Sequence, residues 1–284
     1  MTQDVRDLLR VEPGAAVDLD AHDPRARPAG PRRKADAAAE MAQLGERLDP
    51  LQEALYAAGS TGEGRSVLLV LQGMDTSGKG GVIRRVAGLV NPQGLQIAGF
   101  GRPTAQERRH HFLWRIRRQV PCPGRIGIFD RSHYEDVLVV RVQGLVGEDV
   151  WRPRFAEINI FEQELAAAGT TIVKVFLHIS PDKQLERLLA RLDEPAKRWK
   201  WDPADVEARA QWGTYQRAYE DILHRTSTLN APWYVVPGDR KWYRNWCVAR
   251  LLLETLEELD PRVPQPKFDV AAERARLLAS EPDR

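Results

Sequence analysis

Five short apolar segments alternate with longer amphipathic segments along most of this chain. The apolar segments are residues 66–73, 95–100, 125–130, 171–179 and 232–237. Strands buried on both faces have short continuous apolar runs, and the helices between them cover the two faces of a parallel sheet. The sequence therefore predicts a three-layer α/β fold around a five-stranded parallel sheet.

The segments between the strands repeat their apolar residues every three or four positions, which is typical of helices. We expect helices at residues 79–90, 104–119, 133–143, 151–168, 181–193, 203–227 and 241–259. In the fifth of these, Ser180 suits the N-cap and Pro181 the first helical position. Its leucines form one stripe that we expect to face the core, namely Leu185, Leu188, Leu189 and Leu192.

The N-terminal part is organised differently. Residues 1–33 are rich in proline, glycine and charge, and predict an extended arm with little core of its own. Helical spacing then begins at Lys34, and Asp49-Pro50 interrupts it, so we expect two helices at 35–48 and 50–58. The predicted organisation is an arm (1–33), a helical extension (34–60), a main domain (61–268) and a C-terminal tail (269–284).

Composition excludes several classes of protein. The 284 residues carry a formal net charge of only +2, and no DNA- or RNA-binding module is recognisable, so we expect no nucleic-acid partner. The N-terminus has no signal-peptide pattern, and no apolar run approaches the ~20 residues of a membrane span. Cys122 and Cys247 lie far apart and outside any zinc-binding spacing. These features favour a cytoplasmic location.

The strand at 66–73 leads into "GMDTSGKGG", which resembles a phosphate-binding loop, or P-loop. Gly73, Gly78 and Lys79 have the positions of G-x-x-x-x-G-K, but Gly80 replaces the following Ser or Thr that normally holds magnesium. Backbone N–H groups of such a loop converge on an anion at a helix N-terminus, and the lysine neutralises its charge. Thr76 and Ser77 can also touch phosphate. The loop therefore predicts a phosphoryl-transfer enzyme.

Asp75 is unusual inside an anion-binding loop, because a carboxylate repels phosphate unless a cation or a proton intervenes. It either holds Mg²⁺, directly or through water, or accepts a proton or positions the acceptor. A purely structural role as a helix cap remains an alternative.

The third predicted strand ends in "IFDRSHYED". An acid at the carboxyl end of a neighbouring parallel strand is where P-loop enzymes hold their metal, which makes Asp130 the second candidate metal ligand. Arg131 suits bidentate contact with phosphoryl oxygens, although a local salt bridge with Asp130 is the alternative. Glu135 and Asp136 lie in the next helical turn, where the helix dipole alone also favours acids.

Two basic clusters have helical spacing. The first contains Arg108, Arg115 and Arg118, which we expect on one side of a helix. In the second, Lys183, Arg187 and Arg191 lie opposite the leucine stripe, and Lys197, Arg198 and Lys200 follow. A solvated basic face explains either row alone, but an arginine-rich segment after the fourth strand is where a P-loop kinase has its lid. We expect this lid at about 181–201, with Trp199 and Trp201 as candidates for stacking on a base.

The segments "GMDTSGKGG", "FLWRI", "FDRSHYEDVLVVRV", "DEPAKRWKW" and "APWYVVPGDRKWYRN" together resemble the polyphosphate kinase 2 family, from about Lys34 to Phe268. The resemblance implies a thymidylate kinase-like P-loop fold with a helical lid. It also implies phosphoryl transfer between inorganic polyphosphate and nucleotides with Mg²⁺ (or Mn²⁺ in its place), and a homodimer or homotetramer.

The family's functional residues fall on Asp75, Lys79, Asp130, Arg131 and the lid arginine Arg191. "SHYEDVL" is similar to the subgroup that phosphorylates both AMP to ADP and ADP to ATP, with Tyr134, Glu135, Asp136 and Trp199 as candidate nucleotide contacts. GMP and GDP stay open as acceptors. Candidate phosphate or polyphosphate contacts are Gly73, Thr76, Ser77, Gly78, Gly80, Arg108, Arg115, Arg118, Arg187, Lys197 and Arg198.

This sequence departs from the family pattern at two positions: Asp130 replaces a frequent Asn of that subgroup, and His111 replaces a frequent Asp. Two other functions stay open at this point. One is an ATP-dependent nucleoside monophosphate kinase, which normally needs the hydroxyl missing at Gly80. The other is a regulator that binds polyanions or nucleotides without catalysis, which the set Asp75, Lys79, Asp130 and Arg131 disfavours.

Overall fold

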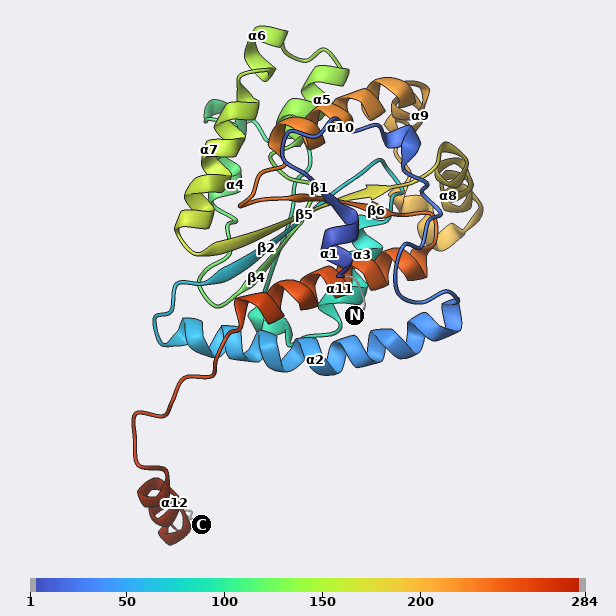
Figure 1. Cartoon of the computed structure of the whole chain (residues 1–284). Coiled ribbons are helices and arrows are strands. Elements are labelled where there is room, and N and C mark those ends of the chain that lie inside the picture. The colour runs from blue at the N-terminus through green and yellow to red at the C-terminus, as the bar shows by residue number, and fades with distance from the viewer. Residues whose placement is uncertain (1–3, 281–284) are drawn as a thin grey trace.

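The computed structural model describes residues 4–280. Its centre is a six-stranded sheet in the order β1-β6-β5-β2-β4-β3 (Figure 1). Strands β2 to β6 are parallel, and β1 pairs antiparallel with β6. The strands are β1 (Arg10–Val11), β2 (Ser66–Gln72), β3 (Leu95–Gly99), β4 (Ile126–Asp130), β5 (Thr170–His178) and β6 (Trp233–Pro237). The five predicted parallel strands are confirmed within one residue at each end, and β1 was not predicted.

The helices form two layers around the sheet, as in a three-layer α/β fold (Figure 1). The layer shown below the sheet contains α2 (Lys34–Ser60), α3 (Lys79–Ala87) and α11 (Lys241–Leu259). The layer above it contains α5 (Glu135–Val142), α7 (Arg154–Ala167) and α10 (Trp212–Thr226). The other helices are α1 (Val5–Leu9), α4 (Trp114–Arg117), α6 (Glu148–Trp151), α8 (Pro181–Asp193), α9 (Ala204–Ala210) and α12 (Val270–Ala279). The 3-10 helices are η1 (Leu19–Ala21), η2 (Pro92–Gly94), η3 (Glu107–Arg109) and η4 (Pro195–Lys200).

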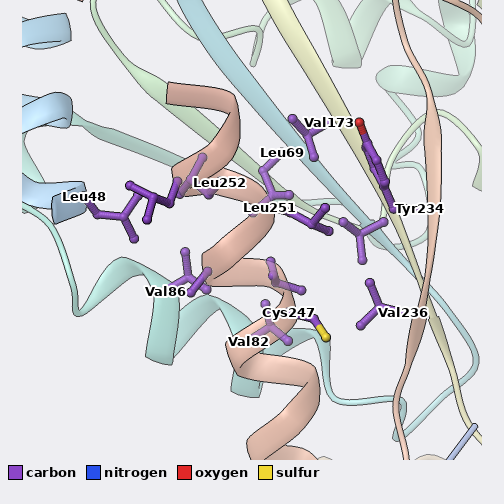
Figure 2. Close-up of a cluster of buried hydrophobic side chains, with 14 of the residues drawn as sticks. Leu48, Leu69, Val82, Val86, Val173, Tyr234, Val236, Cys247, Leu251 and Leu252 are labelled. Carbon is purple, nitrogen blue, oxygen red and sulfur yellow. The ribbon is translucent and has the colours of Figure 1, made fainter. Parts of the chain in front are cut away.

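Each face of the sheet has its own hydrophobic core. Alternate residues of β2 point to opposite faces, so Leu69 packs toward α11 and α3 while Leu68 packs toward α5 and α10. In the lower core, Leu251 and Leu252 of α11 lie between the strands, α3 and Leu48 of α2 (Figure 2). Because β2 and β5 are buried on both faces, the carboxyl end of β2 is held firmly at the centre of the molecule.

Three helix predictions were wrong. Residues 34–60 form one helix rather than two, with Pro50 inside it. The buried face of α2, which includes Leu48 and Leu55, packs along α11, and this packing outweighs the helix-breaking effect of proline. Residues 104–119 form only η3 and the short α4, and the helix expected at 203–227 is divided at Gln211 into α9 and α10.

The N-terminal arm contributes more to the core than its composition suggested. Val5, Leu9, Val11 and Leu19 are all buried, and β1 adds a strand at the edge next to β6. The arm is therefore only partly extended, because its apolar residues use the helix α11 and the strand β6 as a surface. Across the described residues 4–280, we find no helix that is both long enough and apolar enough to span a membrane.

Candidate active site

The P-loop connects the carboxyl end of β2 to the N-terminus of α3. Two of its glycines have positive φ, 146° at Gly73 and 103° at Gly78, and Thr76 is also left-handed at 64°. A Cβ at Gly78 would lie 1.9 Å from Nη1 of Arg244, so both backbone conformation and space require glycine there. A Cβ at Gly80 would meet no atom within 4 Å, so the missing hydroxyl is not a consequence of crowding.

Lys79, the first residue of α3, is buried and folds back over the loop. Its ammonium group donates to the carbonyl oxygen of Gly73 at 2.8 Å. Burial, and then the nearby Arg131, lower the pKa of Lys79, while Asp75, Asp130 and Glu135 act in the opposite direction. The lysine therefore lies at the centre of a group of three acids and one arginine.

Two hydroxyls of the loop are left without a protein partner. The side-chain oxygens of Thr76 and Ser77 are both buried and accept or donate no hydrogen bond among the described residues. A buried hydroxyl without a partner costs free energy, so a ligand oxygen that reached either hydroxyl would gain a favourable hydrogen bond. This arrangement fits the predicted contacts of Thr76 and Ser77 with phosphate.

Asp75 and Arg131 form an ion pair across the gap between β2 and β4, with 2.7 Å between Oδ1 and Nη2. Burial acts to raise the pKa of Asp75, but Lys79, Arg131 and Arg191 outweigh it and lower the pKa below its usual range. Asp75 is therefore ionised at neutral pH. Arg131 itself has a left-handed backbone, with φ 64°, at the point where the chain leaves β4.

Asp130 ends β4, directly beside Leu71 at the carboxyl end of β2. Glu135, one helical turn after Arg131, lies 3.6 Å from its guanidinium group, and burial raises the pKa of Glu135. The structure thus brings together Asp75, Lys79, Asp130 and Arg131, as predicted, and adds Glu135 to them.

Two buried arginines support the loop from behind, and the sequence did not indicate this role for either. Arg187 of α8 donates to the carbonyl oxygens of Thr76 at 2.9 Å and Ser77 at 3.2 Å. Arg244 of α11 donates to the same Ser77 oxygen at 2.7 Å. With the carbonyls held in this way, the N–H groups at the start of α3 remain available for an anion, while that of Ser77 donates to the carbonyl oxygen of Met74 at 3.0 Å.

Arg187, predicted as a phosphate or polyphosphate contact of the lid, is instead buried and donates to backbone carbonyl oxygens. The polar side of α8 packs on the loop, with Gln184 and Arg187 buried, whereas Leu185, Leu189 and Leu192 are 40–50% exposed. Only Leu188 of the leucine stripe is buried. The helix is turned in this way because loop carbonyls, which need hydrogen-bond donors, form the surface beneath it.

From the end of α8 through η4, the lid segment contains both paired and exposed residues. Arg191 forms an ion pair of 2.7 Å with Asp205 at the start of α9, a residue that the sequence analysis did not single out. Burial and then Asp75 raise the pKa of Asp205 to about 6, so Asp205 also lies close to the loop. Lys197 pairs with Glu194, Arg198 donates to the carbonyl oxygen of Leu192, and the ring of Trp199 is 79% exposed.

The predicted row of Arg108, Arg115 and Arg118 is not one helical face. Arg115 is buried and donates to the carbonyl oxygen of Gly101 at 2.8 Å and to Asp136 at 3.3 Å. Arg108 donates to the carbonyl oxygen of Pro103, and the guanidinium group of Arg118 lies over the ring of Trp114. Since no continuous helix spans 104–119, the spacing of three and four residues does not align these side chains.

Two nucleotide contacts predicted in the "SHYED" segment are also not supported. Tyr134 is completely buried, and its hydroxyl donates to Glu162 at 2.8 Å. Asp136 is buried between Arg115 and Arg154. Tyr134 faces the core above the sheet, where α5 packs against α10 and α7, and Asp136 is occupied by its two arginines.

Comparisons with known proteins agree with this geometry. The family model for Polyphosphate kinase 2 (PPK2) matches residues 32–264. An AMP/ADP-polyphosphate phosphotransferase of Meiothermus ruber is 50% identical over 258 residues, which cover 91% of this chain and 95% of the relative. An ADP-polyphosphate phosphotransferase of Rhodopseudomonas palustris is 44% identical and covers 82% of each chain.

A solved structure shows the same fold. The crystal structure of Polyphosphate Kinase 2 from Arthrobacter aurescens TC1 superposes with a TM-score of 0.94 at 46% identity and covers 98% of each chain. The match extends over the loop, the strand ends and the lid segment. This chain therefore belongs to the polyphosphate kinase 2 family, a family of P-loop kinases.

Proposed function

We propose that this chain transfers phosphoryl groups from inorganic polyphosphate to AMP and ADP, reversibly, forming ADP and ATP. The names of the two relatives reported above give AMP and ADP as acceptors for the first and ADP for the second, with polyphosphate in both. The observation that carries the proposal is the loop itself, in which the Lys79 ammonium group and the Asp75–Arg131 pair lie at the turn from β2 to α3 while Gly80 replaces the usual hydroxyl. Such a loop suits a donor other than metal-bound ATP.

Phosphoryl transfer in kinases uses a divalent cation, and the carboxylates here fit Mg²⁺, with Mn²⁺ as a substitute. Magnesium is commonly held by one or two carboxylates together with substrate phosphates and water. Asp75 and Asp130 are such a pair at adjacent strand ends, and within residues 4–280 no cluster of three or more His, Cys, Asp or Glu forms a complete protein cage. When bound, the cation neutralises charge on the phosphates.

The protein residues then have distinct tasks. The loop N–H groups, with the hydroxyls of Thr76 and Ser77, hold phosphoryl oxygens, and Lys79 neutralises them. Arg131 and the lid residue Arg191 approach the transferring group from two sides, and catalysis comes mainly from positioning and charge stabilisation. A general base is hardly needed, since the acceptor phosphate is already anionic.

The outer part of the site binds the rest of the substrates. Lys197 and Arg198 on η4 would contact a phosphate chain after leaving Glu194 and the carbonyl oxygen of Leu192, and the exposed side chain of Trp199 is suited to stacking on a base. Release of Arg191 from Asp205 would let the lid arginine reach phosphate. We further propose a homodimer or homotetramer, which light scattering on the purified protein tests directly.

The experiment is purified protein with Mg²⁺ and polyphosphate, incubated separately with AMP, ADP, GMP and GDP, with products separated by chromatography. We expect ADP and ATP from the adenine nucleotides. A parallel series with ATP in place of polyphosphate tests an ATP-dependent monophosphate kinase. Turnover of AMP with ATP and none with polyphosphate would overturn the proposal, and conversion of ADP alone would change only the acceptor range.

A further inference from the structure

A buried polar cluster contacts His133 and Tyr134, which follow Arg131 in the chain. Its centre is Lys174 of β5, whose side chain is completely buried in the core above the sheet. The ammonium group donates to Glu162 of α7 at 2.6 Å, to the Tyr134 hydroxyl at 2.9 Å and to the carbonyl oxygen of Thr226 at 2.6 Å. Three hydrogen bonds therefore satisfy all three donors of the lysine.

Glu162 joins this lysine to two consecutive residues of the "SHYED" segment. Its Oε1 atom accepts the hydroxyl of Tyr134 at 2.8 Å and lies 3.1 Å from Nε2 of His133. Burial acts to raise the pKa of Glu162, but Lys174 and His133 outweigh it and lower the pKa, so the carboxylate is charged. One ionised carboxylate thus holds the side chains of both His133 and Tyr134.

Stability alone does not account for such a cluster. A buried ion pair pays a desolvation cost that its attraction often only matches, and apolar residues of similar volume do as well or better. Its distinguishing property is geometric, because each hydrogen bond has a fixed direction. The directed hydrogen bonds of the cluster therefore fix the positions of His133 and Tyr134, whatever the cluster contributes to stability.

The position of this segment matters for the candidate active site. Arg131, two residues before His133, leaves β4 with φ 64° and pairs with Asp75 on the P-loop. Ser132 lies between them, and its hydroxyl accepts from Gln72 at the end of β2 at 3.0 Å. Glu135, directly after Tyr134, contacts Arg131 as well. The segment is thus held at His133 and Tyr134 by Glu162, and the flanking residues Arg131 and Glu135 contact each other beside the loop.

We infer that Glu162 and Lys174 are positioning residues for phosphoryl transfer, which hold the His133–Tyr134 segment so that Arg131 keeps its place beside the loop. The inference rests on the proposed function, since it assigns a role in that reaction. Neither residue touches substrate. Tyr134 links them to the segment, which explains why this residue of the motif is buried.

The first test is Tyr134→Phe, which removes the hydroxyl shared by Glu162 and Lys174 and leaves the ring in place. A small displacement of a catalytic group can cost up to about 100-fold in rate, so we expect kcat with polyphosphate and AMP to fall about tenfold while KM changes less than about twofold. Glu162→Gln removes the charge as well and should cost more.

The matched control is Thr170→Val, which deletes a buried hydroxyl at the other end of β5. The Thr170 hydroxyl lies 3.0 Å from that of Ser66, at the amino ends of β5 and β2 and therefore far from the loop at their carboxyl ends. We expect a similar loss of thermal stability in Thr170→Val and an unchanged kcat. All variants are assayed well below their melting temperatures, so that the folded fraction is the same.

A double-mutant cycle separates positioning from a structural effect. If the cluster acts through Arg131, the tenfold loss caused by Tyr134→Phe should shrink to less than about twofold in an Arg131→Lys background. An undiminished loss in that background, or an equal loss of kcat in Thr170→Val, would overturn the inference. If Tyr134→Phe does not fold, Glu162→Gln takes its place in the same cycle. Absence of any transfer by the unmodified protein would instead refute the proposed function.

Discussion

Arg131 at the end of β4 and Asp75 in the P-loop form an ion pair of 2.7 Å. This pair joins two segments that are 56 residues apart in the sequence and connects the ends of two adjacent parallel strands. It leaves an ionised acid and a permanently charged arginine at the position where the loop would receive phosphate. Both residues can therefore exchange their mutual contact for substrate and cation.

Replacing the acid tests this directly. Asp75→Asn keeps the shape and a hydrogen-bond acceptor for Arg131 but removes the charge, so we expect a loss of about 100-fold or more in kcat. Chromatography of ADP formed from AMP and polyphosphate measures it. Asp182→Asn, on an exposed acid at the start of α8, is the control and should leave the rate unchanged. Similar rates for both variants would contradict the role of Asp75.

Alanine substitutions at Gly78 and Gly80 should have opposite effects on stability. Gly78→Ala forces a left-handed alanine, which costs about 1–2 kcal/mol, and also places a methyl group against Arg244. We expect a lower melting temperature and a large loss of activity. Gly80→Ala makes the same chemical change two residues later, in open space inside α3. Its melting temperature should be unchanged or higher, because alanine favours helix by up to about 1 kcal/mol.

Pro50 in the interior of α2 lowers the stability of the fold. Proline removes one helical hydrogen bond and its ring crowds the preceding turn, so Pro50→Ala should stabilise the protein by about 1–3 kcal/mol. Denaturant unfolding measures the change. Pro181→Ala is the comparison, because Pro181 lies in the first turn of α8, where proline is favourable. A gain for Pro181→Ala as large as that for Pro50→Ala would argue against this explanation.

The attachment of the N-terminal arm should depend on pH. Glu254 of α11 accepts the backbone N–H of Val5 at 3.3 Å and of Arg6 at 3.1 Å. Burial, and then a hydrogen bond shared with Asp4, raise the pKa of Glu254 from 4.5 to about 7. Because the folded protein binds this proton more tightly than the unfolded chain, the contribution of Glu254 to stability is complete below pH 4.5 and is lost as the pH rises through 7.

Comparison with Glu254→Gln isolates this contribution. We expect the melting temperature of the unmodified protein to fall relative to that of Glu254→Gln as the pH rises from 5 to 7.5. Above about pH 8 the difference should be constant, since Glu254 is then ionised in both the folded and the unfolded state. A difference that stays constant from pH 5 to 7.5 would show that the pKa of Glu254 is not raised.

The sequence by itself determined the alternation of strands and helices and the residues at the strand ends. Buried strands need continuous apolar runs, and a phosphate loop needs glycines and a lysine at fixed spacing, so these features are local. The five parallel strands, α8 at Pro181–Asp193 and α11 at Lys241–Leu259 were predicted within a residue for this reason. The group Asp75, Lys79, Asp130 and Arg131 followed from the rule that parallel strands end at one edge of the sheet.

Only the tertiary structure decided which face of each helix is buried and which distant residues meet. Helical spacing shows which residues share a face but not what lies opposite, so the exposed leucines of α8 and the buried Arg187 were assigned the wrong way round. Arg244 reaches the Ser77 carbonyl from 167 residues away, and Glu162 reaches Tyr134 across the upper core. Such contacts depend on how complete elements pack, because a buried carbonyl or charge takes whichever donor the packing brings within reach.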